Sequence, residues 1–202
     1  MGVVLAGGLG RRLGGSKATV RVNGLPLITY PVHALRQALG EVVIAAKSDT
    51  ELPGLPGVAV WIEPDEPCHP LAGLVHALEL AQGRAVLICA CDLPLVTPEL
   101  VRDLARTDPQ GAAAVVARAD GRPQPLLGCY RPGALGPLRR ALDDEGVRVL
   151  EAVARLDPRN HDVEDPALLF NVNTPEDLLR AGALLSDRPR AGAAEPPPIS
   201  RA

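Results

Sequence analysis

Aromatic side chains are scarce in this chain of 202 residues, which holds one Phe, one Trp and two Tyr. Proteins that bind single-stranded nucleic acid stack bases on aromatic rings, so this scarcity argues against such a binding platform. A formal net charge of −3 also removes any general attraction to nucleic acid or to an anionic membrane surface. We therefore expect no nucleic-acid partner. Hydrophobic residues still make up 47% of the chain, enough for a core built mainly from Ala, Val and Leu.

Long apolar runs are absent as well. None approaches the ~20 residues that span a bilayer. Gly7 interrupts the apolar N-terminal run too early for a secretory signal. We therefore expect a cytoplasmic protein that has no membrane partner.

Cysteines are few and lack the spacing of a metal site. They stand at positions 68, 89, 91 and 129, so no C-x₂-C pair exists. The chain is also too long to resemble a small secreted scaffold held by disulfides. Cys89 and Cys91 belong to the apolar run "AVLICACD". We expect both to be small buried hydrophobic residues.

Lysine is nearly absent, with two residues against 19 arginines. One of them, Lys17, ends the stretch "VVLAGGLGRRLGGSKA" at residues 3–18, which also contains five glycines, Arg11 and Arg12. Glycine lets backbone N–H groups approach phosphate oxygens without interference from a Cβ, and the cations add charge. We predict that this loop binds the phosphates of a nucleoside triphosphate. A flexible surface turn in a glycine-rich chain is the simpler alternative.

Two common phosphate-binding patterns do not fit this loop. The pattern G-x₄-G-K-[ST] fails because Gly15 is followed by Ser16. The pattern G-x-G-x-x-G fails because Leu13 stands at the third glycine position. The loop is wider than either, and its open amides and cations suit a pyrophosphate that leaves with added negative charge.

Apolar, β-branched runs alternate with helical patterns along most of the chain. This alternation is typical of a mostly parallel sheet with helices on both faces. The expected strands are Val3–Ala6, Val42–Ala46, Val58–Ile62, Ala85–Cys91, Ala112–Ala117 and Leu126–Tyr130. The expected helices are Leu27–Leu39, Leu71–Ala81, Pro98–Ala105, Ala134–Leu142, Val147–Ala154 and Pro175–Leu185. We predict a single α/β domain with a Rossmann-like sheet over residues 1–185, followed by a disordered, proline-rich tail over residues 186–202.

Local signals mark two helix starts and one candidate metal ligand. Thr97 and Thr174 each precede proline and acidic residues, so both are predicted N-caps. The run "VLICACDLP" ends on Asp92. Because ligands gather at the carboxyl ends of strands in open α/β sheets, this carboxylate is well placed to bind Mg²⁺ beside the glycine-rich loop. Aspartate is also common as a turn residue, so the position of Asp92 alone leaves both interpretations open.

Several segments together resemble one enzyme family. The segment "LAGGLGRRLGGSKA" looks like the L-A-G-G-x-S-x-R-M-G-x-D-K-A signature of nucleotidyltransferases similar to molybdenum cofactor guanylyltransferase. The likeness continues through "VNGLPLI" (22–28), "HPLAGL" (69–74), "CACDLPLV" (89–96), "RPQPLLGCYRP" (122–132) and "FNVNTPEDL" (170–178). It covers nearly all of residues 1–185 and implies a fold like that of the nucleotide-diphospho-sugar transferases.

The resemblance implies an enzyme that transfers GMP from GTP to the terminal phosphate of molybdopterin, releasing pyrophosphate and forming molybdopterin guanine dinucleotide. Mg²⁺ is the implied cofactor, and molybdoenzymes or other cofactor-biosynthesis proteins are the implied protein partners. The positions that match nucleotide-binding residues of the family are Leu5, Ala6, Gly7, Gly8, Lys17, Asp65 and Asp92. Asp92 would also bind the metal, and the catalytic residues would be Arg12, Lys17 and Asp92.

Three positions in the segments that resemble the family have more than one possible role. Asp65 stands beside Glu63 and Glu66, which blur its match by a residue or two. Asn171 and Asn173 could approach the metal or the pterin, and they fit equally well as turn residues before a capped helix.

The sequence also departs from the family pattern. Gly10, Leu13 and Ser16 stand where the signature has Ser, Met and Asp, which leaves the phosphate chemistry intact. Ala45 stands where some members present an asparagine to the nucleotide, and His69 where glycine is usual. These two differences bear on the choice of GTP over CTP rather than on the reaction type. The alternative functions are a cytidylyltransferase for molybdopterin, a sugar-phosphate nucleotidyltransferase, or a non-catalytic pterin carrier.

Overall fold

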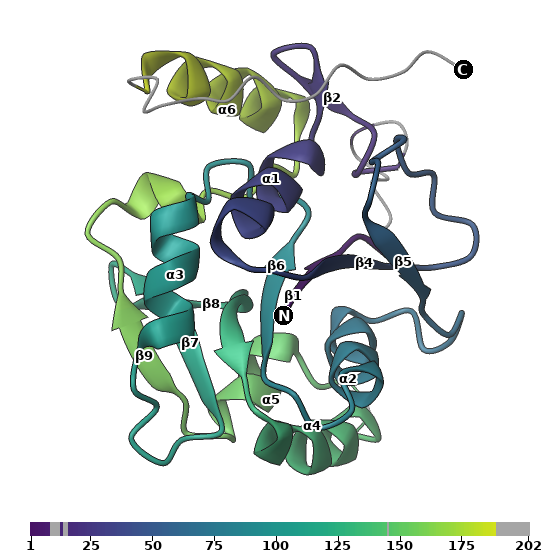
Figure 1. The fold of residues 1–202 in the computed structure, drawn as a ribbon, viewed down its shortest axis with the longest axis vertical. Coiled ribbons are helices and arrows are strands. Elements are labelled where there is room, and N and C mark those ends of the chain that lie inside the picture. Colours follow the sequence, from purple (N-terminus) through teal and green to yellow (C-terminus); the bar gives the residue numbers. More distant parts are fainter. Residues whose placement is uncertain (9–12, 14–15, 145, 189–202) are drawn as a thin grey trace.

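A seven-stranded sheet forms the centre of the protein (Figure 1). The computed structural model describes residues 1–8, 13, 16–144 and 146–188. The strands of this sheet are β1 (Gly2–Leu5), β4 (Val42–Ala46), β5 (Ala59–Ile62), β6 (Val86–Ala90), β7 (Ala114–Ala119), β8 (Arg122–Tyr130) and β9 (Arg159–Asp162). Their spatial order is β5-β4-β1-β6-β8-β7-β9. Within this sheet, β8 runs antiparallel to its neighbours β6 and β7, and every other adjacent pair is parallel. The predicted α/β class with a mostly parallel sheet is confirmed.

Helices cover both faces of the sheet because alternate strand residues point to opposite sides. Val4 packs in one apolar cluster with Leu35, whereas Val3 packs in the other with Leu74. The first face carries α1 (Thr29–Ala38) and α3 (Pro98–Arg106). The second face carries α2 (Pro70–Leu80), α4 (Leu135–Leu142) and α5 (Val149–Ala154). Both layers thus exclude water from the strands, as the continuous apolar runs of the sequence predict.

A small hairpin and the last helix form a separate unit above the sheet (Figure 1). Strands β2 (Arg21–Val22) and β3 (Leu25–Pro26) are joined by Asn23 and Gly24, both with positive φ. This is the Asn-Gly signal of a tight hairpin, which the sequence contains although we predicted no strand there. The Asn23 side-chain amide donates to the carbonyl of Gly182 at 2.9 Å and so attaches the hairpin to α6 (Pro175–Asp187).

The observed elements follow the predicted ones closely in the apolar segments and depart from them in the polar ones. Thr97 and Thr174 accept hydrogen bonds from Leu100 N and Asp177 N, so both predicted N-caps are confirmed. We did not predict β9, because its residues "RNHD" carry no apolar pattern. The predicted strand Leu126–Tyr130 also begins later than β8, whose first residues "RPQP" include prolines that cannot donate to a ladder.

Two further expectations concern buried cysteines and the end of the chain. Cys89 and Cys91 are buried free thiols, as predicted. Helix α6 continues to Asp187, past the predicted domain end at residue 185, and Arg188 Nη1 donates to the carbonyl of Leu95 at 2.7 Å. Residues 189–202 of the predicted tail lie outside the described residues. No helix in the described ranges combines the length and the apolar character needed to cross a bilayer.

Candidate functional site

A cavity of about 490 Å³ opens at the edge of the sheet where the parallel strands β1, β4, β5 and β6 end. This is the edge at which open α/β sheets bind ligands. Because β8 runs the opposite way, its first half reaches the same edge and contributes Leu126. The cavity is lined by Leu5, Gly7, Gly8, Lys17, Lys47, Glu63, Cys68, His69, Pro70, Gly73, Ala90, Cys91, Asp92 and Leu126.

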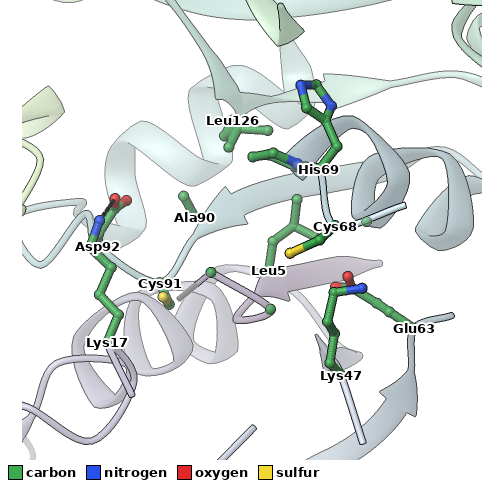
Figure 2. Close-up of a pocket in the computed structure, with 14 residues that line it drawn as sticks. Leu5, Lys17, Lys47, Glu63, Cys68, His69, Ala90, Cys91, Asp92 and Leu126 are labelled. Carbon is green, nitrogen blue, oxygen red and sulfur yellow. Dashed lines mark hydrogen bonds and ion pairs between the residues drawn. The ribbon is translucent and has the colours of Figure 1, made fainter. Parts of the chain in front are cut away.

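One end of the cavity holds an ion pair between the N-terminal loop and the end of β6 (Figure 2). The Lys17 ammonium lies 2.6 Å from Asp92 Oδ2 and donates to Asn173 Oδ1 at 2.7 Å. The Lys17 and Asp92 side chains are only 15% and 14% exposed. Two residues far apart in the sequence are thus brought together where water is scarce, which strengthens their electrostatic interaction. The predicted cation and the predicted carboxylate therefore share one cavity.

A segment just before α6 completes this end of the site. The Val172 N–H donates to the backbone carbonyl of Asp92 at 3.0 Å, which fixes the segment against the end of β6. Asn171 Nδ2 donates to Asp92 Oδ1 at 3.0 Å, and Gln124 Nε2 from β8 donates to Asn171 Oδ1 at 2.6 Å. The two asparagines thus contact Asp92 and Lys17 directly.

The donor set near Asp92 suits a hard divalent cation that is shared with a substrate. No group of three or more His, Cys, Asp or Glu side chains that could hold a metal occurs among the described residues. Mg²⁺ usually takes one or two protein carboxylates and completes its shell with water and substrate phosphate oxygens. One carboxylate on a cavity wall, with amide groups of Asn171 and Asn173 beside it, matches that requirement.

The N-terminal loop reaches the cavity through its backbone. Gly7 and Gly8 line the cavity together with Leu5, whereas Ala6 is fully buried and its N–H donates to the carbonyl of Ala45 at 2.8 Å. Ala6 therefore positions the loop rather than facing the cavity. The predicted catalytic residue Arg12 lies outside the described residues, as do the neighbouring positions 9–11 and 14–15.

The other end of the cavity contains two charged residues, Lys47 and Glu63, to which we assigned no role from the sequence (Figure 2). Lys47 follows β4, and its ammonium donates to the carbonyls of Pro64 and Asp65 at 2.6 and 2.7 Å. Glu63 follows β5 and is only 7% exposed. Burial raises the pKa of Glu63, while the charges of Lys47 and His76 partly oppose that rise. The scarcity of lysine was the available signal for Lys47.

Asp65 does not face the cavity with its side chain. It is exposed, and its Oδ1 accepts a hydrogen bond from Ser48 Oγ at 3.2 Å. Of the three neighbouring acids, the structure directs Glu63 into the cavity. His69, the residue that replaces the usual glycine, also lines the cavity and caps α2, because its Nδ1 accepts from Leu71 N at 3.2 Å.

Comparison with known proteins gives one consistent family. The family model of the MobA-like NTP transferase domain matches residues 2–161. A probable molybdenum cofactor guanylyltransferase from Bacillus licheniformis is 33% identical over 87% of this chain and 93% of its own length. The molybdenum cofactor guanylyltransferase of Cereibacter sphaeroides is 35% identical over 91% and 96%. The crystal structure of molybdopterin-guanine dinucleotide biosynthesis protein A from Archaeoglobus fulgidus matches with a TM-score of 0.72 and 28% identity, covering 93% of this chain and 100% of that one.

Nucleotidyltransferases of this kind generally work with a divalent metal, which agrees with a carboxylate, that of Asp92, on the cavity wall. Gly7, Gly8 and Lys17 from the glycine-rich segment and the carboxylate of Asp92 after β6 line one cavity, and Asn171 and Asn173 contact Asp92 and Lys17 there. With matches that span nearly the whole described fold, this chain belongs to the molybdenum cofactor guanylyltransferase family, within the MobA-like nucleotidyltransferases.

Proposed function

We propose that the protein transfers GMP from GTP to the terminal phosphate of molybdopterin, releasing pyrophosphate and forming molybdopterin guanine dinucleotide. The observation that carries this proposal is the meeting of Lys17 and Asp92 on one wall of a cavity, with Asn173 hydrogen-bonded to Lys17, in a chain of this family. The predicted cytoplasmic location, and transfer of the product to molybdoenzymes or other cofactor-biosynthesis proteins, belong to the same proposal.

The phosphates of GTP would lie at the end of the cavity that holds Lys17. Gly7 and Gly8 line the same cavity, and the absence of Cβ atoms lets a phosphate come close to their backbone. Lys17 would exchange its hydrogen bond to Asp92 for one to a phosphate oxygen, since an ammonium is a movable point charge with three donors. Arg12 is predicted to add a second cation on the departing pyrophosphate.

Asp92 would hold Mg²⁺ through its carboxylate, with Asn171 and Asn173 orienting that carboxylate and Lys17. When bound, the cation neutralises phosphate charge and keeps the triphosphate in one geometry. The Gln124–Asn171–Asp92 chain of hydrogen bonds fixes the carboxylate from the other side, so that it need not reorganise during the reaction.

The chemistry asks little of the protein beyond positioning and charge neutralisation. A phosphate oxygen of molybdopterin forms a bond to the α-phosphorus of GTP, and the bond from that phosphorus to the bridging oxygen of the β-phosphate breaks. The electron pair leaves with pyrophosphate. A phosphate monoester has its second pKa at about 6, so the attacking group is already ionised and needs no general base.

Product analysis tests this proposal against its alternatives. Incubation of the protein with GTP, Mg²⁺ and molybdopterin should release pyrophosphate and give molybdopterin guanine dinucleotide in the mass spectrum. Product formation with CTP in place of GTP would support a cytidylyltransferase. Turnover of a sugar phosphate would support a sugar-phosphate nucleotidyltransferase. Binding of molybdopterin without pyrophosphate release from any nucleotide would support a carrier.

A further inference from the structure

Glu63 is a charged side chain buried on the wall of the cavity, at the end opposite Lys17 and Asp92 (Figure 2). Among the described residues, Glu63 is the one charged residue that is classed as buried. Within the same ranges its carboxylate makes no hydrogen bond to a protein donor. Burial of a carboxylate without hydrogen-bond donors is costly, so this group is suited to accept hydrogen bonds from something that enters the cavity.

The backbone around Glu63 leaves just enough room for its carboxylate. A Cβ on Gly7 would lie 2.9 Å from Glu63 Oε2, and a Cβ on Gly73 would lie 2.9 Å from Oε1. Two glycines from different elements, the loop after β1 and helix α2, therefore enclose the group. Any larger residue at either position would displace it, so its orientation is set by the fold.

We propose that Glu63 selects the guanine base, with its carboxylate accepting hydrogen bonds from the N1–H and the 2-amino group. This inference rests on the proposed function, because it names the group that chooses GTP among nucleoside triphosphates. An ionised carboxylate is an acceptor with two oxygens, and the guanine edge offers two adjacent donors at the matching spacing.

Other bases match this acceptor less well. Cytosine and adenine present an amino group next to a ring nitrogen that is itself an acceptor, and uracil places carbonyl oxygens on both sides of its N–H. Each would bring an acceptor against the buried carboxylate, which is repulsive and leaves charge unpaired. Glu63 thus gives selectivity in a chain that has Ala45 in place of the asparagine of some relatives.

Substitution of Glu63 by Gln tests this directly, with GTP, ITP and XTP as probes in the presence of Mg²⁺. Inosine lacks the 2-amino group and xanthine has an oxygen in its place. The wild type should bind GTP about 10- to 100-fold more tightly than ITP, in the range expected for one hydrogen bond to a charged group, and should reject XTP. In E63Q one acceptor becomes a donor, so GTP should weaken and XTP should gain. Calorimetric titration of the full chain measures all six affinities.

Two further variants make the test specific. Glu66→Gln removes an exposed carboxylate three positions away and should leave all three affinities unchanged. Gly73→Ala keeps the charge of Glu63 but pushes its carboxylate aside, so it should reduce the preference for GTP over ITP without favouring XTP.

The outcomes separate this inference from the proposed function. If the wild type prefers GTP and E63Q keeps the same preferences among the three nucleotides, the role of Glu63 is refuted while guanylyl transfer stands. If Asp65→Asn instead of E63Q shifts the preference to XTP, the selecting carboxylate is Asp65 and the inference is wrong. If the wild type binds CTP and ignores GTP, the proposed function itself fails.

Discussion

Replacement of Lys17 by Met removes one positive charge from the site while keeping a long, flexible side chain. The ammonium is 2.6 Å from Asp92 Oδ2, and both side chains are about 15% exposed or less. Two unit charges about 4 Å apart interact by ~1 kcal/mol in bulk water and by ~4 kcal/mol at an effective dielectric constant of ~20. The low exposure favours the higher figure for Lys17 and a phosphate oxygen. We therefore expect kcat/KM for GTP to fall by about 10²- to 10³-fold, similar to the loss of one preorganised donor.

The same substitution should also lower stability, because the Asp92 carboxylate loses its cation and keeps, from the described residues, the hydrogen bond of Asn171. Removing one partner of a fully buried ion pair costs about 3 to 5 kcal/mol. Since this pair lies at a cavity wall, we expect about 1 to 3 kcal/mol, or a fall in Tm of several degrees. Adding Asp92→Asn to Lys17→Met removes the unpaired charge, so the double variant should melt higher than Lys17→Met alone.

Pyrophosphate release under steady-state conditions measures the catalytic effect, and thermal unfolding measures the structural one. Lys17→Arg keeps the charge and should retain part of the activity. Arg84→Met is a matched control, because Arg84 pairs with Glu41 at the surface, where both side chains are about half exposed. Its kcat/KM should equal that of the wild type. A Lys17→Met enzyme with the kcat/KM of the wild type would refute the assignment of Lys17 to phosphate binding.

Three further changes have directions that follow from the structure. Gly128→Ala should lower the free energy of unfolding in urea by about 1 to 3 kcal/mol, because the added Cβ would lie 2.6 Å from a backbone carbonyl oxygen of β7. Gly133→Ala is the control, because its Cβ would make an ordinary 3.9 Å contact and should leave stability nearly unchanged. Asn173→Ala removes one acceptor of the Lys17 ammonium and should lower kcat/KM by about 2- to 10-fold, the value of a single hydrogen bond. Glu63 should make stability depend on pH, because burial raises its pKa in the folded state above the usual 4.5. The folded state then holds its proton more tightly than the unfolded state, so stability is lost as pH rises through the folded pKa. Glu63→Gln should accordingly melt higher than the wild type at neutral pH and equal to it in acid, and an equal Tm difference at all pH values would contradict this.

Much of the fold follows from the sequence because its signals are local. The apolar runs that became β1, β4 and β6 are buried along their whole length, so period and composition were enough to find them. The side chains of Thr97 and Thr174 accept hydrogen bonds from backbone N–H groups three residues later, so each helix start is specified locally. Strand β9 has no such signal, since its polar residues pair at the sheet edge only because β7 is there to receive them.

The site is a different case, because its contacts join residues that the sequence leaves far apart. Lys17 meets Asp92 across 75 positions and Asn173 across 156. Sequence alone placed Lys17 on a glycine-rich loop after the first strand and Asp92 at the end of a later strand. The pairing of β1 with β6 then brought the ends of these two strands to one edge of the sheet. Among Glu63, Asp65 and Glu66, no pattern distinguishes the inward carboxylate, because strand alternation stops at Ile62. Tertiary structure decided that point: Gly7 and Gly73 leave space for one carboxylate, and Glu63 is the residue whose backbone position reaches it.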